Sequence, residues 1–157
     1  MRIGSGYDVH PFAADRRLVL GGVGFAGESG LAGHSDGDVL THAVIDALLG
    51  AAALGDIGTY FPSTDRGLHN ADSIELLKQV TKLIAAAGYR IVNVDATVMA
   101  ERPRIAPGVA EMRQRLALAL GVELGQVSVK ATTTDGLGAI GRAEGIAVQA
   151  VALLDDA

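Results

Sequence analysis

The fold is decided by a stretch near the end of the chain, Gly145-Ile146-Ala147-Val148-Gln149-Ala150-Val151-Ala152-Leu153-Leu154. It reads as a strand, and apart from Gln149 its residues are apolar on both faces. A strand with two apolar faces lies in the centre of a sheet beneath a second layer, or it packs against another subunit. Both interpretations remain open from the sequence alone.

Helices and further strands are predicted upstream of this stretch. Apolar residues recur with a helical period, each time followed by a glycine that ends the helix, in residues 36–54, 72–87 and 109–120. Strand patterns cover residues 2–12, 91–99 and 127–132. Turn residues interrupt the rest, which predicts short strands or turns in residues 18–33 and loops in residues 55–65 and 101–107.

This alternation of strands and helices predicts an α/β fold of the α+β two-layer kind. We expect a mixed sheet of four to five strands with the helices packed on one face. The 157 residues are enough for one complete domain and few for two, so residues 1–157 are expected to form a single domain.

The composition narrows the classes of function. A net charge of −5 without a basic stripe argues against nucleic acid as a partner. It leaves phosphorylated small molecules open, because these need only local positive groups and metal ions. The chain has no cysteine, which fits a reducing cytosol. No apolar run approaches the roughly 18 residues of a membrane helix. We therefore expect a cytoplasmic protein without a membrane partner.

The clearest chemistry belongs to Asp8, His10 and His42. Asp8 and His10 lie two residues apart in a predicted strand, so their side chains point to the same face. His42 lies in a predicted apolar helix and can add a third ligand from another element. Two imidazoles and one carboxylate form the ligand set of an open catalytic zinc site rather than a closed structural one.

A plainer interpretation stands beside this one. An Asp-x-His pair is common at polar strand ends, and a lone histidine in an apolar helix is commonly a core residue. However, Asp38 and Asp46 lie four residues on either side of His42. Polar residues at this spacing indicate that the helix face meets something polar. A carboxylate that orients a metal-bound imidazole is one such arrangement.

Three later segments contain residues that can hold phosphate or a sugar. Residues 130–138 combine a lysine, three threonines and glycines, which suits an anion but is also ordinary strand-end chemistry. Arg142 and Glu144 form either a surface ion pair or an anion-binding arginine held by a glutamate. Asp56 and Asp65 flank a loop and are turn formers or ligands for a metal or a sugar hydroxyl.

Several segments in this order resemble the 2-C-methyl-D-erythritol 2,4-cyclodiphosphate synthase family over essentially the whole chain. They are Gly6-Tyr7-Asp8-Val9-His10-Pro11-Phe12, His34-Ser35-Asp36-Gly37-Asp38, Asp46-Ala47-Leu48-Leu49-Gly50-Ala51, Gly55-Asp56-Ile57-Gly58, Phe61-Pro62, Thr64-Asp65, Lys130-Ala131-Thr132-Thr133-Thr134 and Gly141-Arg142-Ala143-Glu144-Gly145. The number of separate segments makes a chance match far less probable than any single motif would.

The resemblance implies an enzyme of the non-mevalonate isoprenoid pathway. Its substrate, 4-diphosphocytidyl-2-C-methyl-D-erythritol 2-phosphate, is converted to 2-C-methyl-D-erythritol 2,4-cyclodiphosphate plus CMP. It further implies a homotrimer around a threefold axis with active sites between neighbouring subunits. One Zn²⁺ per subunit would be held by Asp8, His10 and His42, and a second divalent cation, Mg²⁺ or Mn²⁺, by Asp135.

The resemblance also assigns roles to individual positions. His34 and Thr133 match residues that stabilise the transition state. Asp56 and Gly58 match the part that holds the methylerythritol diol, and the cytidine diphosphate end matches residues 100–106 and 132–134. An axial cavity that can hold an isoprenoid diphosphate would include Arg142. The substrate-binding positions are Ser35, Asp56, Ile57, Gly58, Phe61, Asp65, Ala100, Ile105, Ala106, Lys130, Thr132, Thr134 and Arg142.

Three positions depart from the family pattern. Asp135 stands where relatives usually carry a longer glutamate, Ser63 replaces an acidic residue, and Ala139 replaces an aromatic residue found at the axial cavity in some relatives. Two other functions remain open from the sequence. One is a metal-dependent phosphohydrolase or nucleotidase, and the other is a non-catalytic trimer that binds isoprenoid diphosphates.

Overall fold

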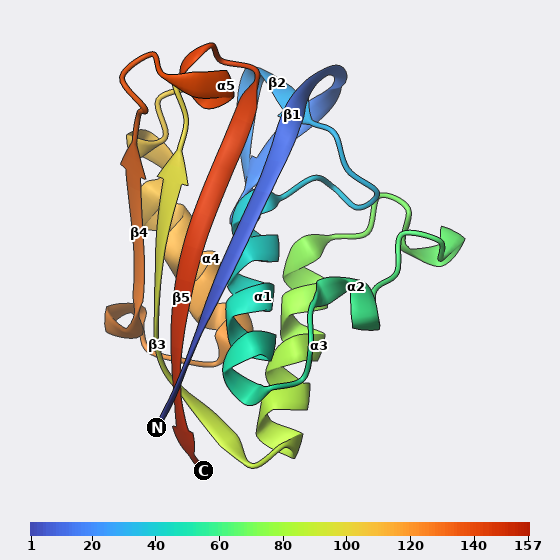
Figure 1. Ribbon diagram of the computed structural model, residues 1–157, viewed down its shortest axis with the longest axis vertical. Helices are drawn as coiled ribbons and strands as arrows, with labels where there is room; N and C mark the ends of the chain where they lie inside the picture. Colours follow the sequence, from blue (N-terminus) through green and yellow to red (C-terminus); the bar gives the residue numbers. More distant parts are fainter.

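The computed structural model describes residues 1–157 and contains one five-stranded sheet in the order β2-β1-β5-β3-β4 (Figure 1). Its strands are β1 (Arg2–Leu20), β2 (Val23–Leu31), β3 (Tyr89–Met99), β4 (Val127–Thr132) and β5 (Gly145–Asp156). The β3–β4 pair is parallel and the other three pairs are antiparallel. The sheet is therefore mixed, as predicted, and the apolar β5 lies at its centre.

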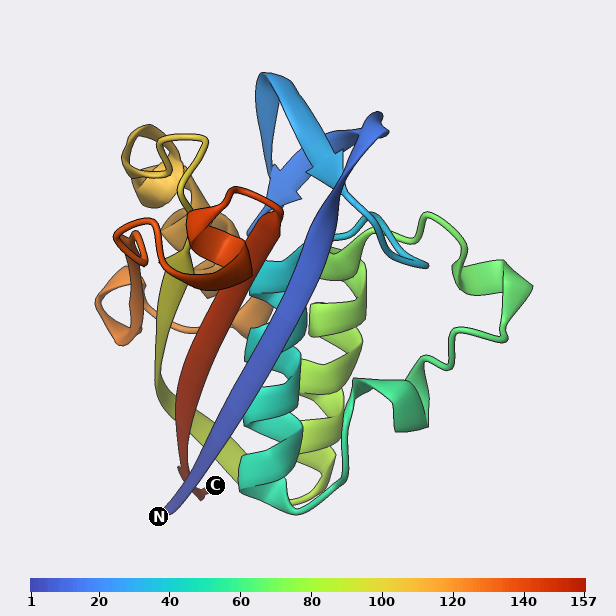
Figure 2. The same ribbon diagram turned by 45° about the horizontal axis from the view of Figure 1, so that its top comes forward.

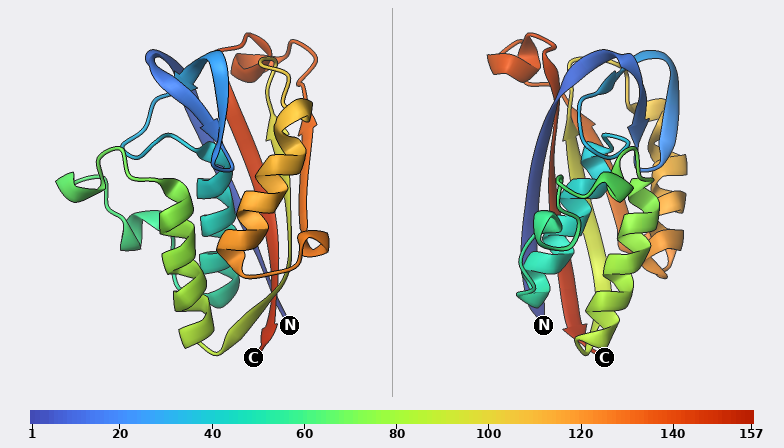
Figure 3. Two further views of the ribbon diagram at one scale, coloured as in Figure 1. Left: turned by 180° about the vertical axis from the view of Figure 1, so that it is seen from behind. Right: turned by 90° about the vertical axis from the view of Figure 1, so that its right-hand side faces the viewer.

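Three helices cover one face of this sheet, as the right-hand view of Figure 3 shows. They are α1 (Val39–Ala52), α3 (Ser73–Ala86) and α4 (Val109–Leu120). The shorter elements are α2 (Ile57–Tyr60), α5 (Gly138–Gly141), η1 (Arg66–Leu68), η2 (Ala106–Gly108) and η3 (Leu124–Gln126). The predicted two-layer α+β architecture is confirmed. None of the helices combines the length and apolar character that a membrane span requires.

The main difference from the prediction lies in the first hairpin. The sequence predicts a first strand that ends at residue 12. In the structure β1 continues to Leu20, and the register of its pairing with β2 shifts between Ala13 and Arg17. It then turns at Gly21 and Gly22, whose φ angles are 56° and 74°. A two-residue hairpin turn with positive φ at both positions favours glycine. Residues 13–17, two alanines followed by three charged residues, show no strand alternation and so hid this part of the strand.

Two glycines of β1 determine how closely α1 approaches the sheet. A Cβ atom at Gly4 would lie 2.2 Å from the Ala47 carbonyl oxygen, and one at Gly6 would lie 2.0 Å from that of Ala43. Only residues without a side chain fit there. Because Gly4, Gly6 and Asp8 share one face of β1, this close approach also brings Asp8 to α1.

The opposite face of the sheet remains open within this chain. On β5 the residues facing the helices are buried, whereas Gln149 is exposed and Val151 is half-buried. On the same open face of β1, Ile3 and Tyr7 are 73% and 61% exposed. The prediction of two apolar faces on the last strand is therefore correct, but the chain itself covers only one of them.

Candidate active site

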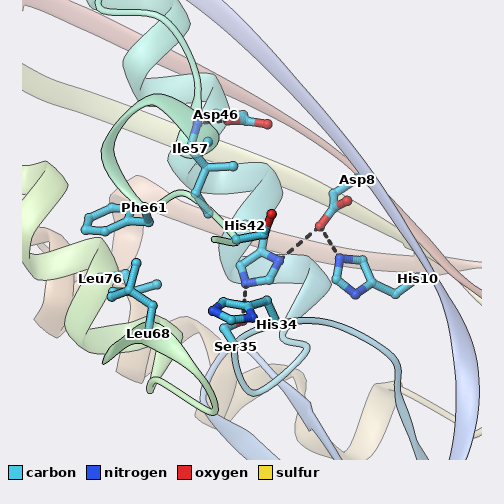
Figure 4. A pocket seen from close by; sticks show the side chains of 12 residues that line it. Asp8, His10, His34, Ser35, His42, Asp46, Ile57, Phe61, Leu68 and Leu76 are labelled. Carbon is cyan, nitrogen blue, oxygen red and sulfur yellow. Dashed lines mark hydrogen bonds and ion pairs between the residues drawn. The ribbon is translucent and has the colours of Figure 1, made fainter. Parts of the chain in front are cut away.

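Asp8, His10 and His42 converge at the junction of β1 and α1 (Figure 4). Asp8 Oδ2 lies 2.8 Å from His10 Nε2 and 3.1 Å from His42 Nδ1. The centres of the two imidazole rings are 5.3 Å apart. The structure thus brings together the three residues that the sequence predicted as metal ligands.

Hydrogen bonds behind the rings orient both histidines. His10 Nδ1 contacts the Ala32 carbonyl oxygen, which can only accept, so Nδ1 carries a hydrogen and Nε2 is the ring nitrogen that faces Asp8. His42 Nε2 lies 2.9 Å from Ser35 Oγ and 3.0 Å from Ser73 Oγ. One carboxylate oxygen and two ring nitrogens therefore meet at one point. This donor set, which contains no sulfur, fits a divalent cation such as zinc.

The electrostatics of the site agree with that fit. Burial alone would raise the pKa of Asp8, but hydrogen bonds from His10 and His42 outweigh it and hold the pKa below its usual value. Burial alone would lower the pKa of His10, but the hydrogen bond and charge of Asp8 raise it above the usual value. Asp8 is therefore ionised and attracts positive charge, whether that charge is a proton on an imidazole or a metal ion.

A cavity of about 250 Å³ opens beside these three residues. It is lined by residues from β1, α1, α3 and the loops around residues 33–35 and 57–68: Asp8, His10, His34, Ser35, His42, Asp46, Ile57, Gly58, Phe61, Ser63, Leu68 and Leu76. Five further predicted site residues, His34, Ser35, Ile57, Gly58 and Phe61, therefore share one cavity with the candidate metal ligands.

The two aspartates of the neighbouring loop act first as turn formers. Asp56 caps α2 by accepting the Thr59 backbone N–H at 2.9 Å, and Asp65 accepts the Gly67 N–H at 2.8 Å. The Asp65 carbonyl oxygen also lies 2.8 Å from His34 Nε2. Neither carboxylate lines the cavity. The loop nevertheless anchors His34 through that carbonyl.

The idea that Asp38 or Asp46 orients His42 is wrong. Asp38 is fully buried and accepts from the backbone N–H groups of Gly21 and Gly22, so it ties the first hairpin to the start of α1. Asp46 accepts the Ile57 N–H at 2.8 Å. Both carboxylates lie four residues from His42 in sequence, but they accept hydrogen bonds from other residues, including Thr41 at the start of α1, and not from the His42 ring.

The remaining predicted residues lie elsewhere. Residues 132–135, which we call the threonine cluster, follow β4 and contact the loop after β3 through a hydrogen bond from Ala100 N to Thr132 O, 3.0 Å long. Figures 1 and 2 place both segments on the β3–β4 side of the sheet, away from the loop that carries α2. The remaining predicted residues form a second group, and none of them lines the cavity beside Asp8, His10 and His42: Ala100, Ile105, Ala106, Lys130, Thr132, Thr133, Thr134, Asp135 and Arg142.

Both basic residues of this second group already have acidic partners. Lys130 Nζ pairs with Asp95 on the open face of the sheet. Arg142 Nε lies 2.6 Å from Glu144 Oε1, and both side chains are more than half exposed. The structure therefore contains the ion pair expected for Arg142 and shows no anion site beside it within one chain.

Sequence reasoning missed two residues that organise the site. The Arg16 guanidinium donates to the carbonyl oxygens of Gly33 and Ser35, which flank His34. Ser73, the first residue of α3, is fully buried against His42. No local pattern could have identified either, because their partners are between 17 and 31 residues away in the chain.

The fold and the site define an α+β protein in which two histidines and an aspartate that could hold a metal ion lie beside a cavity. The family model described as "YgbB family" matches residues 1–155, so the chain belongs to this family. The resemblance inferred from the sequence is confirmed.

Among relatives, the chain is 60% identical to a 2-C-methyl-D-erythritol 2,4-cyclodiphosphate synthase from Moorella thermoacetica, covering 99% of this chain and 96% of that protein. Among solved structures, the bifunctional IspDF from Campylobacter jejuni matches with a TM-score of 0.96 and 44% identity, and 99% of this chain spans 42% of that one. IspF from Plasmodium falciparum, solved as a CDP complex, matches with a TM-score of 0.86 and 35% identity over 99% of this chain and 96% of that one.

Proposed function

We propose that this chain converts 4-diphosphocytidyl-2-C-methyl-D-erythritol 2-phosphate to 2-C-methyl-D-erythritol 2,4-cyclodiphosphate and CMP, as a lyase of the non-mevalonate isoprenoid pathway. Membership of the family supports this activity. The observation that carries it in this chain is the convergence of Asp8, His10 and His42 beside a cavity lined by polar residues.

Asp8, His10 and His42 would hold one Zn²⁺ per subunit, and Asp135 would contribute to a second site for Mg²⁺ or Mn²⁺. These ions, when bound, supply positive charge that orients the diphosphate and stabilises departing CMP. The chain supplies the fixed geometry: Ala32 holds the His10 ring so that its Nε2 lone pair faces the cation position. The substrate phosphate is itself the nucleophile and is largely dianionic near neutral pH, since its second pKa is about 6. The chain therefore needs no general base.

Residues around the cavity would bind the rest of the methylerythritol phosphate. His34, held through Nε2 by the Asp65 carbonyl, and Ser35 lie beside the metal ligands and would contact phosphate oxygens, with His34 stabilising the transition state. Ile57, Gly58 and Phe61 line the wall, and Asp56 at the start of α2 would bind the diol. Holding both ends of one substrate makes ring closure an orientation problem that the protein solves by binding.

The nucleotide end would be bound by Ala100, Ile105, Ala106, Lys130, Thr132 and Thr134, with Thr133 acting on the transition state. Within one chain these residues lie away from the cavity. We therefore propose a homotrimer around a threefold axis, in which the threonine cluster of one subunit completes the metal cavity of the next. The open sheet face, with exposed Ile3 and Tyr7, supports burial against other subunits.

The proposal also covers the domain organisation, the cellular location and the partners. We assign residues 1–157 to one domain that acts in the cytoplasm, with a small-molecule substrate and neither nucleic acid nor a membrane as partner. An isoprenoid diphosphate in the axial cavity would have to compete with Glu144 for Arg142. Neither a phosphohydrolase nor a non-catalytic isoprenoid-binding trimer is favoured, because the relatives are named as synthases.

Product analysis tests the activity. The purified protein is incubated with the diphosphocytidyl substrate, and the products are followed by phosphorus NMR with and without a chelator. We expect cyclodiphosphate and CMP in equal amounts, and their loss when the divalent ions are removed. Release of inorganic phosphate or of an open-chain diphosphate would contradict the proposal and favour a hydrolase.

Mixing two inactive variants tests the shared sites. His42→Ala removes a metal ligand, and Thr133→Val alters the threonine cluster, so each variant alone should be inactive or nearly so. Equal mixtures assembled together should recover about a quarter of the sites, because each site needs an intact cavity from one subunit and an intact threonine cluster from its neighbour. No recovery in mixed trimers would contradict sites formed between subunits.

A further inference from the structure

A hydrogen-bond chain behind His42 contains two residues that the proposed reaction does not use, Ser73 and Asp36. Ser73 is fully buried at the start of α3. Its Oγ lies 3.0 Å from His42 Nε2 and donates to Asp36 Oδ1 at 2.5 Å. Asp36 Oδ2 also accepts the Ser73 backbone N–H at 3.0 Å. A carboxylate thus holds the serine, and the serine contacts the imidazole.

The chemistry of these groups sets the direction of each hydrogen bond. An ionised carboxylate only accepts, and a serine hydroxyl has one hydrogen. The hydroxyl hydrogen of Ser73 therefore points to Asp36, and Ser73 Oγ offers His42 a lone pair. His42 must then donate from Nε2, so in the neutral ring the lone pair is on Nδ1, which lies 3.1 Å from Asp8 Oδ2 and faces the cation position.

We infer that Ser73, held by Asp36, is a positioning residue that fixes the tautomer and orientation of His42 for cation binding. The inference rests on the metal centre proposed above. A ring in the other tautomer presents an N–H to the cation position and cannot bind it. The larger the fraction of His42 rings in that tautomer, the weaker the apparent metal affinity. Partners that orient metal-binding histidines typically contribute about 10- to 100-fold in affinity.

The same geometry separates the roles of two serines. Ser35 Oγ lies 2.9 Å from His42 Nε2, but its side chain has no carboxylate partner, and Ser35 lines the cavity. Because His42 Nε2 carries the hydrogen, the Ser35 hydroxyl does not donate to it, and its hydrogen can point to Ser73 Oγ, 3.4 Å away, or to a ligand in the cavity. Ser73 therefore orients His42 for cation binding, whereas Ser35 faces the proposed phosphate position.

The test compares variants that each lose one hydroxyl from α3. Ser73→Ala removes the acceptor that Asp36 orients toward His42 Nε2 and leaves only the Ser35 hydroxyl there. Thr81→Val is the matched control, because Thr81 Oγ1 bonds only to the carbonyl oxygens of Leu77 and Ala119. Asp36→Asn keeps the shape of the carboxylate but weakens its hold on Ser73. Zn²⁺ affinity is measured by chelator competition, and Co²⁺ spectra report the geometry of the bound ion.

We expect Ser73→Ala to weaken Zn²⁺ binding by about 10- to 100-fold, Asp36→Asn by less, and Thr81→Val not at all. In metal-free protein, nitrogen NMR of the neutral ring should show one tautomer of His42 in the wild type and a mixture in Ser73→Ala. That tautomer shift is a result that a merely structural role for Ser73 would not produce.

Four results would overturn the inference. The first is equal affinity of Ser73→Ala and Thr81→Val, whether both are unchanged or both are weakened. The second is an unaltered His42 tautomer in Ser73→Ala. The third is wild-type affinity in Asp36→Asn, which also serves as the test if Ser73→Ala does not fold. The fourth is a wild-type protein that binds no Zn²⁺, and this result alone would also remove the metal centre of the proposed function.

Discussion

The metal-ligand group of Asp8, His10 and His42 and the threonine cluster of residues 132–135 differ in how completely one chain builds them. The side chains of the first group are largely buried and bonded to one another. The second group follows the end of β4, and its exposed side chains bond mainly among themselves, as Thr133 Oγ1 does with Asp135 Oδ1 at 3.3 Å. Contacts within one chain enclose the first region, whereas the threonine hydroxyls of the second region lie near the surface and bond only to residues close by in the sequence.

The two regions also differ in the interactions that stabilise them. The candidate metal ligands are held by hydrogen bonds inside a low-dielectric environment, where a misplaced polar group is costly. The threonine hydroxyls are solvated and gain little until a ligand or another subunit orders them. Changes in the first region should therefore alter zinc content, while changes to the threonines of the second region should alter turnover without loss of zinc.

The largest expected effect comes from His42→Ala. We expect metal affinity to fall by more than about 100-fold, because even residues that only orient a ligand contribute 10- to 100-fold. Turnover should be lost with the metal, and the assembly should persist. Metal analysis and size-exclusion chromatography measure these effects. His69→Ala, which changes an exposed histidine outside the group, is the control, and full metal content in His42→Ala would refute the assignment.

Thr133→Val should show that the threonine cluster affects turnover independently of metal binding by Asp8, His10 and His42. We expect kcat to fall by about 100-fold, the effect typical of losing one donor to a transition state, with metal content unchanged. Steady-state kinetics and metal analysis on the same preparation check both parts. Thr81→Val again provides the control for loss of a hydroxyl. A loss of metal in Thr133→Val would show that the regions are not independent.

Arg16→Ala should loosen the loop that carries His34 without removing a metal ligand. The guanidinium donates to carbonyl groups on either side of His34, and hydrogen bonds to charged groups contribute about 1.5–3 kcal/mol. We expect the free energy of unfolding to fall by about that amount, and KM to rise. Urea denaturation and kinetics measure the effects. The neighbouring Arg17→Ala should be nearly neutral, and equal effects of the two variants would argue against this role of Arg16.

The smallest effect is expected for Lys130→Met. The hydrogen bond from Lys130 holds the pKa of Asp95 below its usual range. The stabilisation by this pair is therefore present above the ordinary aspartate pKa of about 3.9 and is lost as the pH falls through the lower folded value. Because the pair is exposed, its loss should cost less than about 1 kcal/mol at neutral pH. Urea denaturation of Lys130→Met and of the control Lys82→Met across pH would reveal the difference, and a gap that widens in acid would contradict it.

Much of the fold followed from local patterns. The helix predicted for residues 109–120 and the strand predicted for residues 127–132 coincide with α4 and β4. Helical and strand periods are local properties of the chain, so such segments are readable without a structure. The middle of β1, residues 13–17, and the short helices α2 and α5 were missed. They lie in polar or glycine-rich segments, where pairing and capping, not apolar periodicity, define the structure.

The residues of the candidate site were likewise predicted only in part. Asp8, His10 and His42 were identified because their residue types are metal ligands and because the strand period places Asp8 and His10 on one face. Asp38 and Asp46 were misjudged, since helical spacing gives neighbours along one helix but not the direction of a carboxylate. Ser73 and Arg16 carried no local signal.

The sequence by itself determined which residue types could bind a cation, which faces were apolar and to which family the chain belongs. Only the tertiary structure decided which groups meet. The absence of side chains at Gly4 and Gly6 lets α1 approach β1, so that Asp8 reaches His42, 34 residues further along the chain. The start of α3 then places Ser73 against the far side of the same ring. Contacts of this kind depend on how elements pack, and no periodic pattern in a single segment records them.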